Sequence, residues 1–163
     1  MRSVLRPLMA SLTGVLLTAA FGAEAGTATA TLSARVQVEA SCRVGDLTLD
    51  FGQYRSGQNS PAVTQGRIQI TQCAVGSVKV ELDGGGSGQI AARKLSGPNG
   101  ATLNYQLYKD SAKTKVFGRG AKGRTVTIGS SGSASVLVVG RIPAGQTVAP
   151  GTYTDTVHIT VTF

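Results

Sequence analysis

The sequence contains no tryptophan and one histidine, and it has only eight acidic residues among 163. One histidine and two cysteines are too few to suggest a zinc site. A Ser-His-Asp arrangement would have to use His158, and the sequence has no nucleophile-elbow motif. Nothing points to a pair of catalytic carboxylates either. We therefore expect no enzymatic activity, no metal and no cofactor.

Charged residues are also scarce, at 15% of the chain, and glycine, serine and threonine take their place. No stretch shows the 3.6-residue periodicity of an amphipathic helix. Threonine, valine and interspersed glycine weaken helices, whereas threonine and valine favour strands. The composition therefore predicts an all-β domain with many turns.

Basic residues outnumber acidic ones, which gives a formal net charge of +8. The densest basic stretch covers residues 109–124, where glycine and serine are interleaved and Phe117 is the one aromatic. A solvated basic loop or hairpin is the simpler interpretation. Contact with anionic cell surfaces or polymers is the alternative. Nucleic acid is not an expected partner, because the protein is expected to be exported.

Export is predicted from the first 25 residues, which have the regions of a secretory signal peptide. Arg2 and Arg6 supply positive charge, residues 8–21 form a short apolar run, and residues 23–25 form an Ala-x-Ala cleavage site. The run is shorter than the roughly 20 residues that a membrane-spanning helix needs. We predict cleavage before Gly26, with a membrane anchor as the alternative.

The two cysteines, Cys42 and Cys73, are expected to pair. An even number of cysteines in a small exported domain indicates a disulfide, since exported proteins meet oxidising surroundings. The bridge would close a loop of about thirty residues and contribute roughly 3–4 kcal/mol. A reactive thiol pair is disfavoured, because the spacing is not that of a C-x-x-C motif and no histidine is nearby in the sequence.

Apolar and polar residues alternate at both ends of the predicted mature chain, in residues 27–38 and 152–163. A period of two indicates a strand with one buried face. Since the second strand reaches the final residue, we expect no further strand after it. Shorter strand candidates lie between turn-forming residues, and together they argue for a β-sandwich. Their ranges are 47–54, 66–72, 77–82, 89–95, 102–108, 115–117, 124–128 and 133–142.

Three features of the sequence have plain structural interpretations. The glycine-rich stretch 83–88 lacks the following helix and the Lys-Ser or Lys-Thr of a phosphate loop, so we expect a turn. His158 falls on the threonine face of the last strand and is expected to be exposed and without a role. Asp155 interrupts the apolar face of that strand, and we expect it to accept hydrogen bonds from backbone amides.

An ordered set of motifs resembles those of the spore coat U domain family, the major-pilin-like subunits of archaic chaperone–usher pili. The resemblance covers essentially all of the predicted mature chain. One departure is Phe117 before Gly118, where the family often has tryptophan. The matching segments are Ala40-Ser41-Cys42, Leu49-Asp50-Phe51-Gly52-Gln53-Tyr54, 68–73, 103–110, 139–143, 151–157 and the terminal Phe163.

The resemblance implies an immunoglobulin-like β-sandwich that lacks its last strand. A periplasmic chaperone would fill the gap, and at the outer-membrane usher the N-terminal segment of the next subunit would replace it. The result would be a surface fimbrium, a homopolymer that supports adhesion and biofilm formation. The implied division is a signal peptide at 1–25, a donor segment at 26–38 and a pilin domain at 39–163.

Two sets of residues are expected to carry assembly. We expect Leu32, the bulkiest donor residue, to fill the deepest pocket. The donor face consists of Ala28, Ala30, Leu32, Ala34, Val36 and Val38, and the acceptor groove includes Val157, Ile159, Val161 and Phe163. The alternative for residues 27–38 is an ordinary first strand of their own domain. The alternative function is a self-contained secreted adhesin or matrix protein that binds anionic surfaces or glycans.

Overall fold

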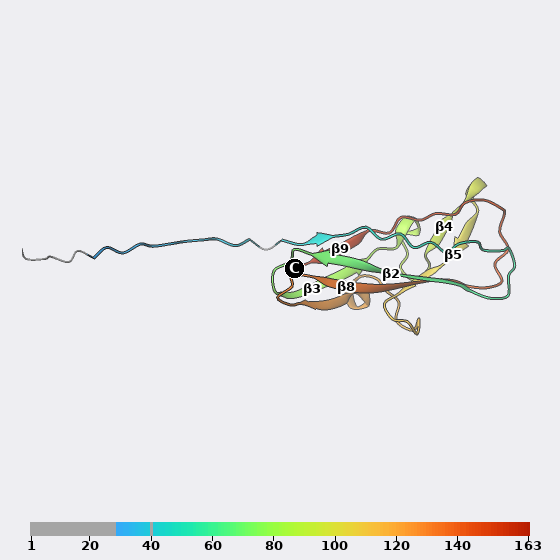
Figure 1. The fold of residues 1–163 in the computed structure, drawn as a ribbon. Helices are drawn as coiled ribbons and strands as arrows, with labels where there is room; N and C mark the ends of the chain where they lie inside the picture. Colours follow the sequence, from blue (N-terminus) through green and yellow to red (C-terminus); the bar gives the residue numbers. More distant parts are fainter. Residues whose placement is uncertain (1–28, 40) are drawn as a thin grey trace, which may run out of the picture. The chain divides into compact units, whose positions relative to one another are not determined.

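The structure is a computed structural model that describes residues 29–39 and 41–163. The chain divides into two units, Met1–Gln37 and Val38–Phe163 (Figure 1). The predicted signal peptide, residues 1–25, and the donor residue Ala28 lie outside the described residues. In the described ranges, no helix is both long and apolar enough to span a membrane.

The described part of the predicted donor segment, residues 29–38, belongs to no strand, and all of its residues are exposed. The large apolar side chains are the most informative, because Leu32 is 95% exposed and Val36 is 84% exposed.

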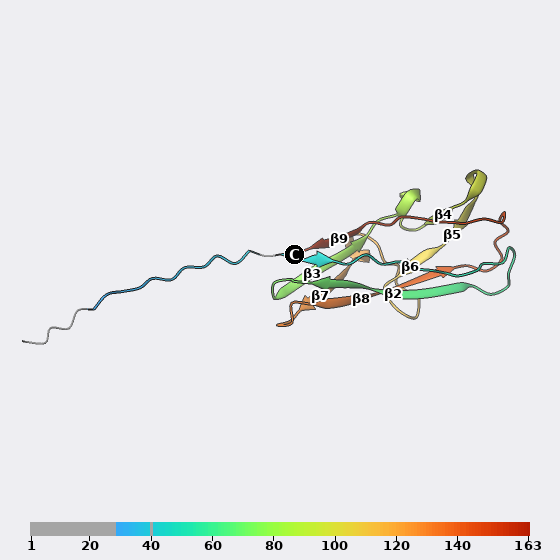
Figure 2. The ribbon, with the colours of Figure 1, turned by 45° about the horizontal axis from the view of Figure 1, so that its top comes forward.

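The second unit is built from antiparallel strands in three sheets (Figures 1 and 2). The first sheet has the order β1 (Arg43–Val44), β2 (Ala62–Thr71), β8 (Ala134–Ile142) and β6 (Gln106–Tyr108). The second has the order β7 (Arg124–Ile128), β3 (Gly76–Leu82) and β9 (Ile159–Thr162). A small hairpin pairs β4 (Lys94–Ser96) with β5 (Thr102–Asn104). Short 3-10 turns occupy Gly85–Ser87, Pro98–Gly100 and Gly120–Lys122.

A single apolar core lies between the first and second sheets. The ladder of β2 and β8 is the longest, from Ala62 opposite Ile142 to Ile70 opposite Ala134. The inward positions of β2 alternate with exposed ones, as the period of two requires, and Ile68 and Ile70 are fully buried, whereas β8 is buried on consecutive residues from Val138 to Gly140. The core cluster includes Ile68, Ile70, Val136 and Val138 of the first sheet and Val78, Val80, Leu82 and Ile128 of the second. The predicted all-β sandwich is confirmed.

The predicted disulfide between Cys42 and Cys73 is confirmed. It joins the residue before β1 to a position just after β2, and β1 pairs with the end of β2 through Arg43 and Val44. The bridge therefore fixes the point at which residues 46–54 leave the first sheet.

Residues 47–54 differ from their prediction, because they form no strand. Their side chains still alternate: Leu47, Leu49 and Phe51 are half-buried, and the residues between them are exposed. Within the described structure, residues 46–54 make no backbone–backbone hydrogen bond. The segment is thus extended in the manner of a strand but has no neighbouring strand to pair with.

Three further predicted strands are shorter than expected. Of residues 89–95, only the last two belong to β4, and residues 88–93 are mainly turn. Residues 115–117 make a single bridge, from Val116 to Tyr108. Of residues 152–163, only β9 is a strand, although the buried and exposed positions alternate from Tyr153 to Thr162. The alternation is correct in the last case, but the continuous ladder stops where the neighbouring strand β3 ends, and Thr154 makes a single bridge with Ser96.

Candidate functional site, a groove with two unpaired walls

A groove of about 1320 Å³ runs along the second unit. Its first wall is the segment 44–56 and its second wall is the segment 148–159. Three apolar residues, Leu95, Leu103 and Ile142, complete the lining. The groove therefore lies between two segments that are each more than ten residues long.

The two walls run in opposite directions. At one end, the amide of Val148 donates to Ser56 Oγ at 2.9 Å, and the Tyr54 hydroxyl donates to the Pro143 carbonyl at 2.9 Å. At the other end, Leu47 and Ile159 line the same cavity. A strand placed in the groove would therefore be antiparallel to one wall and parallel to the other.

The second wall presents unpaired backbone groups to the groove. Thr154 exchanges hydrogen bonds with Ser96, and the His158 carbonyl accepts from the Asp83 amide, so these residues direct their backbone toward β4 and β3. Because the backbone direction alternates along an extended segment, Asp155 and Val157 face the other way. No hydrogen bond to their amides or carbonyls is found in the described structure. Such an edge is a template for an added strand.

A smaller cavity of about 130 Å³ shares much of this lining. It is bordered on the second wall by Asp155, Val157 and Ile159 and on the first wall by Leu47, Leu49 and Phe51. Its remaining lining is the core side of the sandwich, namely Ile68, Leu82, Leu95, Tyr105, Leu107 and Val138. Apart from Asp155 and the Tyr105 hydroxyl, these side chains are apolar, and the cavity suits a single aliphatic side chain.

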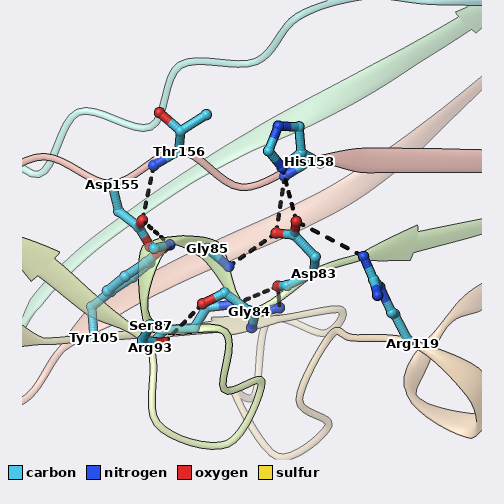
Figure 3. A network of polar contacts seen from close by, with 11 residues as sticks. Asp83, Gly84, Gly85, Ser87, Arg93, Tyr105, Arg119, Asp155, Thr156 and His158 are labelled. Carbon is cyan, nitrogen blue, oxygen red and sulfur yellow. Dashed lines mark hydrogen bonds and ion pairs between the residues drawn. The ribbon is translucent and has the colours of Figure 1, made fainter.

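Asp155 is the polar exception, and its predicted role as an acceptor for backbone amides is confirmed. Its Oδ1 accepts from the amides of Gly86 and Thr156 at 2.7 and 2.9 Å, and its Oδ2 accepts from the Tyr105 hydroxyl at 2.6 Å (Figure 3). Burial and this hydrogen bond raise the pKa of Tyr105 above its ordinary value. The phenol therefore stays protonated and keeps donating to the carboxylate.

His158 is exposed, as predicted, but the expectation that it has no role is wrong. Its Nδ1 lies 2.9 Å from Asp83 Oδ2, and its amide donates to Asp83 Oδ1 at 3.0 Å (Figure 3). Asp83 Oδ1 also accepts from the Gly85 amide, at 2.9 Å. The glycine-rich turn, the end of β3 and the second wall are therefore held together by one carboxylate.

The pKa of Asp83 is shifted by opposing effects. Burial raises it, but hydrogen bonds from the Gly85 amide and from the side chain and amide of His158 outweigh burial and lower it. A carboxylate with a lowered pKa stabilises the fold above its ordinary pKa and loses that contribution as the pH falls through its folded-state pKa.

We predict that acidification below about pH 4 destabilises the fold and that Asp83→Asn removes part of this effect. At neutral pH the same substitution should cost roughly 1–3 kcal/mol, because it removes hydrogen bonds to a charged acceptor. Urea unfolding followed by circular dichroism between about pH 2.5 and 7 would measure both effects. Asp46→Asn, at an exposed residue, is the control. Parallel pH curves for Asp83→Asn and the parent would contradict the assignment.

Arg93, which no pattern in the sequence singles out, is fully buried beneath this network. Its Nε and Nη2 both donate to the Asp83 carbonyl, and its Nη1 donates to Gln106 Oε1 at 2.7 Å. Burial lowers the pKa of Arg93, and the nearby Tyr105, Asp83 and Asp155 oppose that effect. The guanidinium thus anchors the residue that holds the second wall.

The predicted acceptor residues fall into two groups. Val157 and Ile159 line the groove. Val161 is half-buried against the core and Phe163 is 60% exposed, and neither contributes to the lining. The sequence prediction omitted Leu47, Leu49 and Phe51 of the first wall, although their alternation marked one common face.

The predicted donor residues Ala30, Leu32, Ala34, Val36 and Val38 are all exposed.

Comparisons with known proteins agree with the fold. The profile of the Spore Coat Protein U domain matches residues 28–160. Protein U of Myxococcus xanthus is 30% identical over 185 aligned residues, which cover 99% of both chains. A solved structure of the CsuC–CsuE chaperone–tip adhesion subunit pre-assembly complex, from archaic chaperone–usher Csu pili of Acinetobacter baumannii, has a similar fold. Its TM-score is 0.58 at 23% identity, over 77% of this chain and 40% of that chain. The match to the domain profile and the full-length similarity to Protein U show that the chain belongs to the spore coat protein U domain family.

Proposed function

We propose that this protein is a structural subunit of a surface pilus assembled by a chaperone and an usher. Copies would polymerise when residues 27–38 of one copy insert into the groove of the next. The fibre would lie at the cell surface after export through the periplasm and would support adhesion and biofilm formation. The fold similarity to a complex from chaperone–usher pili supports this proposal.

One observation carries the proposal: a groove with two unpaired walls occurs in a chain that also has an exposed segment of matching length and pattern. Twelve residues in extended form span about 40 Å at roughly 3.3 Å each, and the second wall, 148–159, is also twelve residues long. The even-numbered residues of the segment are apolar and the odd-numbered ones are polar. Each apolar side chain that enters the groove would contribute about 1–2 kcal/mol.

The same geometry supports a need for a chaperone. Until the groove is filled, it exposes apolar side chains together with unpaired amides and carbonyls, a combination that invites aggregation. A periplasmic chaperone would cover the groove, and an outer-membrane usher would then exchange the chaperone for the next subunit. A self-contained adhesin or matrix protein, the alternative, would instead be a stable monomer without a chaperone.

Two adjacent substitutions test the proposal, because both residues are exposed in the single chain. Leu32→Asp should abolish fibres, since its carboxylate would have to be buried in an apolar groove, whereas Ser33→Asp should leave assembly intact. Electron microscopy and sedimentation of surface material would score both, and capture by the chaperone would show that each variant is folded. Removal of residues 26–38 should act like Leu32→Asp. Normal fibres from Leu32→Asp or from the shortened chain would refute the proposal.

A further inference from the structure

Asp155 is the one charged side chain shared by the groove and the small cavity. Both of its oxygens are held, by the Gly86 and Thr156 amides and by the Tyr105 hydroxyl (Figure 3). The carboxylate therefore cannot turn away from the groove without breaking these hydrogen bonds. It is a fixed polar group among side chains that, apart from the Tyr105 hydroxyl, are apolar on the inner side of the groove.

A strand inserted in the groove must accommodate the Asp155 carboxyl group. A large aliphatic side chain opposite Asp155 would press against this hydrogen-bonded carboxyl group and exclude water from it, which is costly. A small side chain avoids that contact. The 130 Å³ cavity is bordered by Asp155, Val157 and Ile159. A large aliphatic side chain opposite Val157, the middle of the three, would enter it without lying directly opposite the carboxylate. The second wall thus requires a small donor residue opposite Asp155 and a large donor residue opposite Val157.

The direction of the inserted strand follows from where chains enter and leave the domain. Each copy enters its own domain at β1, which lies at the 44/159 end of the groove. If the inserted strand is antiparallel to the second wall, the body of the donor copy lies beyond the other end, near Ser56 and Val148. A strand inserted parallel to the second wall would place the body of the donor copy at the 44/159 end, where the acceptor's own chain enters its domain.

We propose that Asp155 sets the register of assembly by selecting a small residue, Ala34, from the donor copy. This inference rests on the proposed function. Leu32 then lies opposite Val157 and fills the small cavity. The remaining antiparallel pairs are Ala30 opposite Ile159 and Val36 opposite Tyr153.

The neighbouring registers are worse for identifiable reasons. A shift of two residues one way places Leu32 against Asp155, and the opposite shift places Val36 there. A shift of one residue turns the polar face of the donor inward. The predicted register is the one that satisfies both the carboxylate and the cavity.

Disulfide trapping tests this register without disturbing the apolar face. In the predicted register, Ser33 lies opposite Thr156, and this pair does not exchange backbone hydrogen bonds, so its Cα atoms should be about 4.5 Å apart. We would introduce Thr156→Cys together with Ser33→Cys, Thr31→Cys or Arg35→Cys into the whole chain and assemble it in cells with its chaperone and usher. The Ser33 variant should give a covalent ladder on a non-reducing gel, and the other two should give none.

The outcomes distinguish failure of the proposed register from failure of the proposed function. Fibres that form a ladder with Thr31→Cys or Arg35→Cys, or that form none with any variant, overturn the register and leave the proposed function standing. A cross-link within single copies, or a parent chain that forms no fibres, overturns the proposed function itself.

Residue size gives a second readout. Ala34→Leu should slow assembly by about tenfold or more, and adding Asp155→Ala should restore much of the rate. Ser33→Leu, the same change on the outer face, should have little effect. Unchanged assembly of Ala34→Leu would contradict the role of Asp155 even if Asp155→Ala folds poorly.

Discussion

Replacing Arg93 with alanine should lower the free energy of unfolding by about 3–5 kcal/mol, a large effect for a residue outside the apolar core cluster. The guanidinium is fully buried and donates to the Asp83 carbonyl and to Gln106 Oε1. Removing it leaves a cavity and deprives the Asp83 carbonyl of its donor, while Gln106 Oε1 keeps only the Leu107 amide. Arg93→Lys should be intermediate, since an ammonium keeps the charge but lacks the planar fork.

The substitution should also destabilise the second wall of the groove, because Asp83 makes hydrogen bonds with His158 of that wall. Urea unfolding of the chain beginning at Gly26 would measure the loss of stability. Arg67→Ala is the matched control: Arg67 is exposed and has only a 3.4 Å contact with Ser135 Oγ, so we expect less than about 1 kcal/mol. Equal stabilities for the Arg93 and Arg67 variants would show that the buried network contributes little.

The side-chain pattern of both groove walls could be predicted from the sequence, but their lack of partners could not. Alternation at residues 152–163 indicated which side chains point inward as far as Val161, although Phe163 is exposed, and the same alternation is visible at Leu47, Leu49 and Phe51. Alternation reports burial, however, and says nothing about whether the backbone has a neighbour. Pairing depends on segments far away in the sequence. Here β3 ends at Leu82, and the second wall beyond it is joined to its neighbours through the backbones of Asp83 and Ser96, on one side of the wall.

The polar network was largely beyond prediction for the same reason. The acceptor role of Asp155 followed from its position on an apolar face, which is a local signal. The contact of His158 with Asp83 joins residues 75 positions apart, and Arg93 lies in a short run with no periodicity. The buried guanidinium of Arg93 is explained only by its acceptors, the Asp83 carbonyl and Gln106 Oε1, which the fold brings together. The disulfide, in contrast, needed only two cysteines and an exported chain.

Strand insertion should leave a large signature in hydrogen exchange. In assembled material, the amides of Asp155 and Val157 should gain partners that they lack in the described structure. The amides of residues 30–36 should be protected with them, because a central strand donates to both of its neighbours. We expect exchange at these sites to be slower than in an unstructured peptide by about a thousandfold or more.

The measurement that tests the central claim most directly is therefore amide hydrogen exchange on purified fibres. Thr154 is an internal reference, since its amide already donates to Ser96. The account predicts that residues 30–36, Asp155 and Val157 are all as well protected as Thr154. Exchange of these amides at peptide rates, in fibres where Thr154 is protected, would show that the groove is not filled by this segment.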